Sequence, residues 1–306
     1  MRILAIGEAM IELAPSVDSA SGLYRAGLAG DTLNTAYYLR GCCSTDWHVG
    51  FLTRLGVDSQ SEHLKQFVSG LGIDMPEIPP HPNRIPGLYM ITLDKGERSF
   101  SYWRETSAAR TLMSEPEAVS LAISTAEVVY LSGITLAILS PQGRADLLGL
   151  VSKSGARLAF DPNYRPGLWA DPRTARSAFM KAASLCDFVL PSFDDERALF
   201  GDTDPDVTGH RYGEAGAREV VVKNGAEPGL VWQGGTVTGF TVQNMVNAVD
   251  TTSAGDSFNA GYLSARLRGD DVKRAVTAAQ ALAAEVVSHH GALVPLEILK
   301  ARLPNF

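Results

Sequence analysis

Short runs of β-branched residues alternate with longer stretches of helical periodicity along most of the chain, and this alternation limits the fold more than any other feature. Strands that alternate with helical stretches are typical of a parallel sheet covered by helices. The sequence therefore predicts an α/β fold. The expected strands are Ile3–Ile6, Val49–Leu52, Val128–Leu131, Leu158–Phe160, Phe188–Leu190 and Val220–Val222.

Two further elements are expected in the C-terminal third. A hairpin of Leu230–Gln233 with Thr236–Thr241 should sit on the main body. The residues after it should be helical, because apolar side chains recur there at steps of three and four and form one stripe. The stripe is Val272, Ala275, Val276, Ala279, Leu282, Ala283 and Val286.

The composition excludes several classes of protein. Of the 306 residues, 45% are hydrophobic and 20% are charged, as in globular chains and unlike disordered ones. The net charge of −7, without a basic stretch, argues against nucleic-acid or membrane partners. Cys42, Cys43 and Cys186 are interpreted as reduced thiols. Glu8 interrupts the first apolar run before a signal peptide can form, so a cytoplasmic location is expected.

Two segments, about 10–30 and 75–110, break the alternation and are expected to form a small β lid inserted into the α/β body. Leu88–Leu93 and Ser99–Trp103 are strand-like and flank a turn at Asp94–Glu97. Open α/β sheets bind ligands at the ends of their strands, where such a lid would lie. We therefore interpret residues 1–306 as a single domain with an inserted lid.

The lid hairpin carries candidate ligand-binding residues. Counting back from the turn pairs Leu93 with Arg98, Ile91 with Phe100 and Tyr89 with Tyr102. Opposed residues share a face, as do residues two apart, so Tyr89, Tyr102 and Arg104 should project from one side. Two phenols and a guanidinium suit a polyhydroxylated acid. The same residues also fit plain cross-strand packing beside a solvated arginine.

The segment DTTSAGDSFNAG, Asp250–Gly261, contains the most informative constellation. It follows a β-like segment, Val242–Val249, and opens a helix. The backbone amides of small residues at a helix N-terminus favour an anion such as a phosphoryl group. Asp256, in the first turn, faces the same space and can take the proton of an attacking hydroxyl. The predicted anion hole is formed by the amides of Ser253, Ala254 and Gly255.

Helix capping is the other interpretation of Ser253 and Asp256, because serine and aspartate are favoured at helix starts. No other phosphate motif competes with this segment. The chain contains neither G-x-x-x-x-G-K-[ST] nor G-x-G-x-x-G after its first strand.

Four motifs in this sequence resemble those of the ribokinase-like, phosphofructokinase-B-type carbohydrate kinases. Asp250–Gly261 is similar to the family's D-T-x-G-A-G-D signature, and Ala29–Ala36 to its G-G-x-x-x-N sugar-binding segment. Asp161–Arg165 resembles the D-x-N-x-R motif, and Val222–Gly229 the K-x-G-x-x-G nucleotide loop. The motifs follow the family's order over the whole chain.

The resemblance implies a three-layer α/β/α fold with a central, mostly parallel sheet and a small β lid. It implies ATP and Mg²⁺ as cofactors, with a monovalent-cation requirement left open, and Asp256 as general base. The residues implied in ATP binding are Asn163, Arg165, Lys223, Asn224, Gly225, Gly229, Asp250, Ser253 and Gly255. Those implied in substrate binding are Gly30, Asp31, Asn34, Tyr89, Tyr102, Arg104, Arg165 and Asp256.

The chain departs from the family pattern at three places. Ser253 replaces the first glycine of G-A-G-D, which should be tolerated if that residue needs no positive φ. Ala29 replaces the first glycine of the N-terminal pair. The N-x-x-E motif, whose glutamate helps to hold Mg²⁺ through water, is degraded to Ser192–Glu196. Spacing puts Asp195 in the acidic place, with Glu196 as the alternative.

Within the family, the combination of residues implies phosphorylation of the acid sugar 2-keto-3-deoxygluconate to 2-keto-3-deoxy-6-phosphogluconate. The residues that carry this are Gly30–Ala36, Tyr89, Ser101–Arg104 and Asp161–Trp169. Arg165 suits the substrate carboxylate, the phosphates or support of a loop.

Two other functions remain open: a kinase for a neutral sugar such as fructose or ribose, and a non-catalytic sugar-binding or nucleotide-binding member of the fold. Retention of Asp256 argues against the second, because a pure binder needs no base there. The exposed edge of the lid predicts a homodimer formed through it.

Overall fold

Eight strands within the described residues form one sheet, in the order β12-β11-β10-β9-β8-β7-β1-β4. The computed structural model describes residues 1–16, 22–94, 97–243, 246 and 248–303. The strands from β10 to β4 pair in parallel, and β11 and β12 form an antiparallel hairpin at one edge. The bounds are β1 (Arg2–Ile6), β4 (His48–Leu52), β7 (Val128–Ser132), β8 (Arg157–Asp161), β9 (Phe188–Val189), β10 (Glu219–Val222), β11 (Gly229–Gln233) and β12 (Thr236–Phe240).

The sequence prediction of an α/β fold is confirmed. Each of the six expected strands is present, and the hairpin expected around residues 230–241 joins the same sheet. One expectation was wrong: the described residues of the β-like segment Val242–Val249 form no strand. The amides of Val249 and Asp250 instead donate to the carbonyl of Val287, at the end of a helix.

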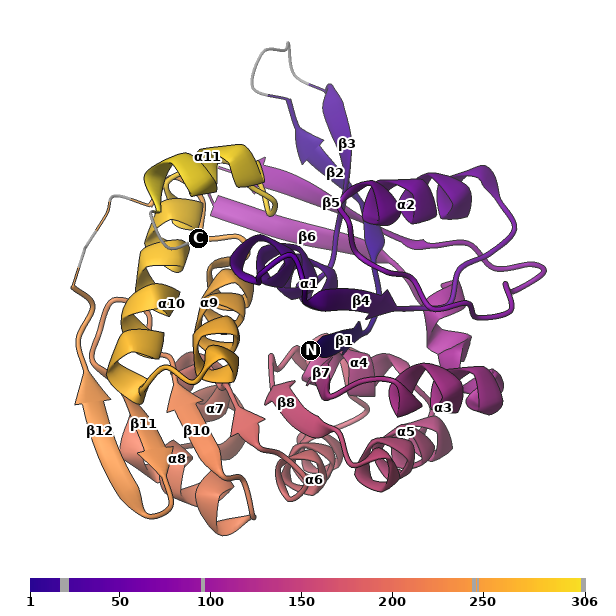
Figure 1. Cartoon of the computed structure of the whole chain (residues 1–306). Coiled ribbons are helices and arrows are strands. Elements are labelled where there is room, and N and C mark those ends of the chain that lie inside the picture. The colour runs from indigo at the N-terminus through magenta and orange to yellow at the C-terminus, as the bar shows by residue number, and fades with distance from the viewer. Residues whose placement is uncertain (17–21, 95–96, 244–245, 247, 304–306) are drawn as a thin grey trace.

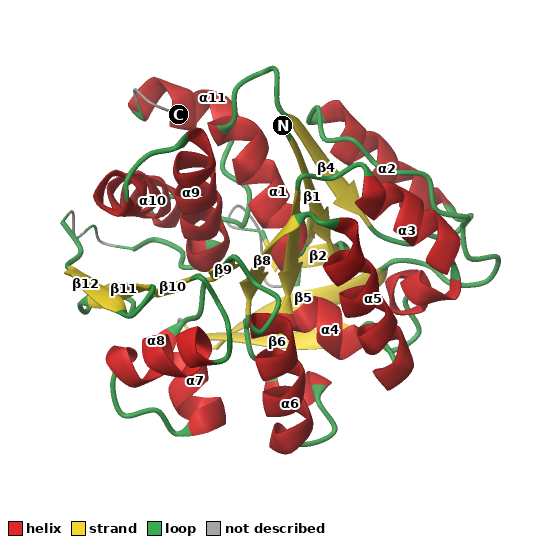
Figure 2. Ribbon diagram, turned by 60° about the horizontal axis from the view of Figure 1, so that its bottom comes forward, coloured by secondary structure: helices red, strands yellow, loops and turns green. Residues whose placement is uncertain are grey.

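Helices cover both faces of this sheet (Figures 1 and 2). Strand side chains alternate between the layers: Ile3 and Ala5 pack in one apolar core, Leu4 and Ile6 in the other. The first layer contains α1 (Asp31–Cys42), α2 (Ser59–Gly70), α9 (Ala254–Arg268), α10 (Val272–Val287) and α11 (Leu296–Arg302). The second contains η1 (Ala108–Ser114), α3 (Pro116–Ser124), α4 (Gly133–Ile138), α5 (Pro141–Ser154), η2 (Pro166–Leu168), α6 (Pro172–Ala183), α7 (Phe193–Phe200) and α8 (Pro205–Glu214).

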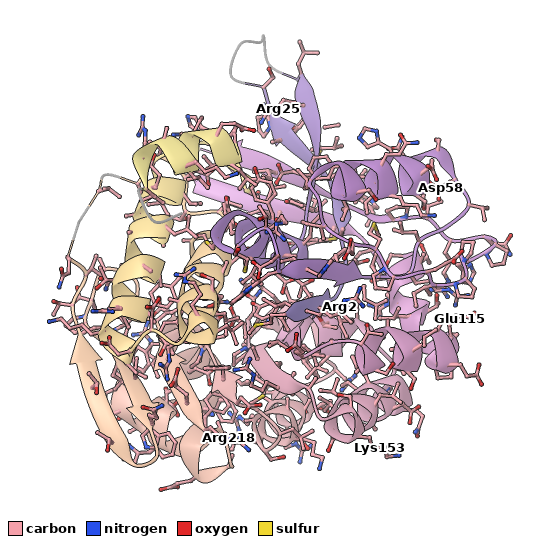
Figure 3. The ribbon with its side chains drawn as sticks, in the orientation of Figure 1. Arg2, Arg25, Asp58, Glu115, Lys153 and Arg218 are labelled. Atoms are coloured by element: carbon pink, nitrogen blue, oxygen red, sulfur yellow. The ribbon has the colours of Figure 1, made fainter. Side chains whose placement is uncertain are left out.

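Local sequence signals account for several of the helix boundaries. Asp58, labelled in Figure 3, begins α2 by accepting hydrogen bonds from the amides of Gln60 and Ser61. The expected apolar stripe near the C-terminus lies on α10, which packs against α9, and its buried members, Ala279 and Leu282 among them, belong to the apolar core on that side of the sheet. No helix among the described residues is both long and apolar enough to cross a membrane.

A second sheet of four strands has the order β3-β2-β5-β6. Its strands are β2 (Met10–Pro15), β3 (Tyr24–Ala29), β5 (Gly87–Asp94) and β6 (Glu97–Trp103), all within the two segments expected to form a lid. The predicted pairing of Tyr89 with Tyr102 and of Ile91 with Phe100 is confirmed. Lys95 and Gly96 of the expected turn lie outside the described residues.

The second sheet starts where the first parallel strand ends. Only three residues, from Gly7 to Ala9, separate β1 from β2. The carboxyl ends of the parallel strands present polar residues at this edge: Glu8 after β1, Ser132 at the end of β7, Asp161 at the end of β8 and Lys223 after β10. Ligands of open α/β sheets bind at such an edge.

Candidate active site

Asp256 lies in the first turn of α9, where Asn34 on α1 contacts it. The Asn34 Nδ2 amide donates to Asp256 Oδ2 at 2.9 Å, and Asn34 Oδ1 accepts from the Gly30 amide at 3.3 Å. Glycine is required at position 30 because a Cβ there would lie 2.2 Å from the carbonyl oxygen of Glu8. The structure thus joins the N-terminal and C-terminal motifs into one site.

The environment of Asp256 raises the pKa of its carboxyl. Burial raises its pKa from 3.8 to about 7, and the negative charge of nearby Asp31 adds to this. Hydrogen bonds from Asn34 and Ser253 oppose the rise. A carboxylate with a pKa near the working pH is well placed both to exist as the base and to accept a proton.

Asp31 and Asn163, both predicted site residues, contact each other next to Asp256. The Asn163 Nδ2 amide donates to Asp31 Oδ2 at 3.0 Å, and its backbone amide donates to Asp161 Oδ1 at 3.1 Å. Asn163 has a φ of 35°, which asparagine tolerates better than most residues. Burial raises the pKa of Asp31 as well.

Lys223 belongs to a buried polar cluster below the start of α9. Its Nζ donates to Asp161 Oδ2 and to Asn259 Oδ1, both at 2.9 Å. Asn259 Nδ2 also donates to Asp161 Oδ2 at 2.6 Å and to the Tyr130 hydroxyl at 3.0 Å. A Cβ added to Gly255 would lie 3.5 Å from Lys223 Nζ. A positive charge therefore lies beside the amides of the α9 N-terminus.

Sequence reasoning did not select Asn259. Its one available signal was its position three residues after Asp256, which puts the two side chains on the same face of a helix.

The predicted anion hole needs two corrections. Ser253 has φ 65° and ψ 11°, the left-handed conformation, so the condition under which serine should be tolerated at this position, a φ that need not be positive, is not met. The loop turns sharply there to begin α9, which explains why a glycine suits the position. The amide of Ala254 donates to the carbonyl of Thr251 at 3.2 Å and is already engaged.

Asp195 and Glu196, the two candidates for the metal position, point in different directions. Arg165 Nη1 lies 3.3 Å from Asp195 Oδ2 and donates to the carbonyl of Tyr164 at 2.8 Å. Burial raises the pKa of Asp195, and the negative charge of Asp161 adds to the rise. Glu196 is fully buried on the other side of α7, where Arg211 Nη2 donates to it at 2.7 Å. Glu196 therefore faces away from the site.

The other residues expected to bind ATP shape the chain around it. Asn224 Nδ2 donates to the Pro228 carbonyl at 3.0 Å, and Gly225 has a φ of 57°. A Cβ on Gly229 would lie 2.5 Å from both the Phe240 ring and the Val222 carbonyl, so glycine there is required by strand packing. Asp250 accepts hydrogen bonds from the amides of Thr252 and Gly291 at 2.9 and 2.8 Å, tying two loops together.

The residues selected on the second sheet do share one side. The rings of Tyr89 and Tyr102 lie 5.9 Å apart, and the Arg104 guanidinium lies 5.9 Å from the Tyr102 ring. The solvated arginine considered from the sequence is wrong, since Arg104 is only 5% exposed and its Nε donates to Glu8 Oε2 at 2.8 Å. Tyr102 is half exposed.

Two buried carboxylates here were missed by the sequence reasoning. Glu8 forms an ion pair with Arg104, and Glu12 accepts a hydrogen bond from the hydroxyl of the buried Tyr89. Glu12 lies on β2, which pairs Glu12 with Tyr89. Neither residue stood out in the sequence, because a carboxylate beside a strand usually faces water.

The chain belongs to the pfkB family of carbohydrate kinases, because the model of that family, described as "pfkB family carbohydrate kinase", matches residues 1–299. A curated relative is the 2-dehydro-3-deoxygluconokinase of Dickeya dadantii (strain 3937), 38% identical over 98% of this chain and 98% of that protein. The family predicted from the four sequence motifs is thereby confirmed.

Solved structures show the same fold. The PfkB protein from Polaromonas sp. JS666 has a TM-score of 0.82 and 27% identity, covering 98% of this chain and 99% of that one. An Escherichia coli protein assigned as ribokinase II, solved with ATP and Mg²⁺, has a TM-score of 0.84 and 22% identity over 100% and 99% of the two chains.

Proposed function

We propose that this carbohydrate kinase transfers the γ-phosphoryl group of ATP to the terminal hydroxyl of 2-keto-3-deoxygluconate, giving 2-keto-3-deoxy-6-phosphogluconate. The observation that carries the proposal is the hydrogen bond from Asn34 to Asp256. It holds the Asp256 carboxylate, whose pKa is raised, at the N-terminus of α9. The Dickeya relative, named for this activity, supports the choice of substrate.

Asp256 is the general base of the proposed reaction. As the acceptor hydroxyl attacks, its proton passes to the Asp256 carboxylate, its oxygen bonds to the γ-phosphorus, and ADP leaves with the electrons of the broken P–O bond. The negative charge that develops on the phosphoryl oxygens is stabilised by the N-terminus of α9 and by the ammonium of Lys223. The free amides of the first turn, including that of Gly255, are the expected donors.

The nucleotide is proposed to lie along the loop after β10, with its base in a neighbouring cavity. That cavity, about 380 Å³, lies between β12 and α10, and its lining includes Pro228, Phe240 and Val276. Asn224 shapes the same loop through its bond to Pro228. A largely apolar slot next to a phosphate site suits a flat heterocycle.

Mg²⁺ is proposed to bind next to Asp195. In the described ranges no group of three or more His, Cys, Asp or Glu is placed to hold a metal ion by itself. A cation at the single carboxylate of Asp195 would take its other ligands from phosphate oxygens and water. Burial and Asp161 raise the pKa of Asp195, so a cation there would relieve an unfavourable negative charge. When bound, Mg²⁺ supplies positive charge to the phosphates. The E. coli protein solved with ATP and Mg²⁺ supports this cofactor pair.

The acid end of the sugar is proposed to bind under the second sheet, which we interpret as a lid. Arg104 Nε donates to Glu8 Oε2 at 2.8 Å, and the backbone carbonyl of Glu8 packs against Gly30 of the proposed sugar-binding segment, so the Arg104 guanidinium is close to that segment. Its Nε and Nη2 atoms are directed at Glu8, and Nη1 is the atom left for a substrate carboxylate. Tyr102, half exposed above it, can bond a sugar hydroxyl. Arg165 is held by Asp195 and is proposed to serve the phosphates.

A panel of sugars with and without a carboxylate, assayed for ADP release, tests the substrate. Turnover of 2-keto-3-deoxygluconate well above that of fructose and ribose is expected. Faster turnover of a neutral sugar would replace the substrate while keeping the enzyme class. Tight binding without turnover of any sugar would indicate a non-catalytic member of the fold.

We also propose a homodimer formed through the second sheet, in the cytoplasm. β6 is an edge strand, and its Phe100 and Tyr102 rings stack at 6.2 Å while both stay 44–50% exposed. Exposed edges and aromatic patches are often covered by a partner. Light scattering measures the oligomeric state of the wild type and of F100E, and the proposal expects a dimer for the first and a monomer for the second. Activity assays in Na⁺ and in K⁺ test the monovalent-cation requirement separately.

A further inference from the structure

Ser253 has a strained backbone conformation that the usual capping role of a serine at a helix start does not explain. Among the described residues, only Ser253 and Asn163 are non-glycine residues with φ in the left-handed region, and Ser253 has φ 65°. Serine at the start of a helix normally adopts an extended conformation and caps a backbone amide. The Ser253 side chain makes no such capping bond.

The Ser253 hydroxyl is directed at the base instead. Its Oγ donates to Asp256 Oδ2 at 2.9 Å, and Asn34 Nδ2 donates to the same oxygen at 2.9 Å. Within the part of the chain that the structure describes, no side chain donates to Oδ1 of Asp256. The two carboxylate oxygens are therefore unlike: Oδ2 is held by two donors and Oδ1 is not.

We propose that Ser253 is a positioning residue for the base, whose hydroxyl holds Asp256 Oδ2 so that Oδ1 receives the proton of the sugar hydroxyl. This inference rests on the proposed role of Asp256. A donor on Oδ2 fixes the rotation of the carboxylate and favours its ionised form. Because Oδ2 still accepts both bonds after Oδ1 is protonated, the arrangement need not reorganise during the proton transfer.

Several charged and titratable groups surround Asp256, and nearby charges affect a pKa. A variant that tests Ser253 must therefore leave these groups unchanged. They are Asp31 on α1, Asp161 on β8, Lys223 after β10, and the phenols Tyr38, Tyr89 and Tyr130. Substitution of Ser253 changes none of these groups. It alters only one neutral donor to the base.

The test compares Ser253→Ala with Ser253→Gly. Both remove the hydroxyl, but only glycine also removes the strain. Both variants should lower kcat about 5- to 20-fold at pH 7 and move the acid limb of kcat/KM upward by about half a pH unit or more. Only Ser253→Gly should also raise Tm, by roughly 2 °C. A ¹³C carboxyl titration, assigned with Asp256→Asn, should show the same upward shift in Asp256.

Ser140→Gly is the matched control, because Ser140 begins α5 with an ordinary cap, accepting from the Gly143 amide at 3.0 Å. It should leave both the pH profile and kcat unchanged, and it should not raise Tm. If kcat and the acid limb stay within two-fold and 0.2 units of wild type in both Ser253 variants, Ser253 acts only through its backbone and the inference is wrong. If Asp256→Asn itself stays active, the proposed base is wrong, which is a separate outcome.

Discussion

Asn34 and Asp256 are 222 positions apart in the chain, yet the Asn34 Nδ2 amide donates to Asp256 Oδ2 at 2.9 Å. This bond connects the start of α1, which carries the proposed sugar-binding segment, to the first turn of α9. A substrate hydroxyl bound by the first would therefore lie next to Asp256, the proposed base, on the second.

Replacement of the proposed base, Asp256, should abolish most of the activity. Asp256→Asn keeps the size of the side chain but accepts no proton, so kcat should fall by roughly 10²- to 10⁴-fold. The KM for ATP should change little. Asp271→Asn is the control, since Asp271 only caps α10 through the Arg274 amide. A near-normal kcat in Asp256→Asn would show that Asp256 is not the base and serves only the start of the helix.

The pKa of Asp256, raised to about 7, predicts the pH dependence of activity. The base must be ionised, so kcat/KM should fall about tenfold per unit as pH drops below about 7. Burial is the larger cause and Asp31 the second, so Asp31→Asn should move this limb to lower pH while lowering the rate. A limb near pH 4 in the wild type would contradict the raised pKa.

The same shift predicts how stability depends on pH. A carboxyl whose folded pKa lies above its unfolded value favours unfolding once it ionises, so this contribution to stability is lost between about pH 4 and 7. Asp256→Asn should therefore raise the free energy of unfolding at pH 8, by on the order of 2 kcal/mol, and change it little near pH 4. Urea unfolding at the two pH values measures this difference. Equal effects at both would show that ionisation of Asp256 is not the cause.

Selection for an acid sugar should depend on Arg104. Arg104→Ala alone would leave Glu8 buried without a partner, at a cost of about 3–5 kcal/mol of stability, so its loss of activity would be ambiguous. The double variant Glu8→Gln with Arg104→Gln removes both charges. Its ratio of kcat/KM for acid over neutral sugar should fall about ten- to hundred-fold.

Glu8→Gln alone should maintain or increase that ratio, because it frees the Arg104 charge from its partner. Tyr102→Phe should cost less than the loss of the Arg104 charge. Equal weakening of acid and neutral sugars in the double variant would show that Arg104 supports the second sheet rather than binding the carboxylate.

Substitutions of Asp195 and of its neighbour Glu196 should have different effects, the first on Mg²⁺ binding and the second on stability. Asp195→Asn should raise the Mg²⁺ concentration for half-maximal rate by about tenfold, with little change in Tm. Glu196→Gln should leave the Mg²⁺ dependence alone and lower stability by about 3 kcal/mol, because Arg211 would lose a buried partner. Reversed results would exchange the two assignments.

The sequence alone predicted most of the elements that depend on local periodicity, with the β-like segment Val242–Val249 as the exception. Apolar runs predicted the strands of the main sheet, the i, i+3, i+4 stripe predicted α10, and turn chemistry predicted that Tyr89 opposes Tyr102. These features repeat within a few residues, so their signals are read directly from neighbouring side chains. The order of four short motifs likewise indicated the family.

Only the tertiary structure decided which polar groups meet. Arg104 pairs with Glu8, 96 positions away, because β2 and β5 run in parallel beside the end of β1. Ser253 takes a positive φ at the end of the loop that precedes α9, a loop whose Val249 and Asp250 amides donate to the Val287 carbonyl of α10. Glu196 faces the core, where Arg211 on α8 pairs with it. Such partners come from the topology of the sheet and from long-range packing, and no periodic pattern in the chain encodes which charge will lie opposite another.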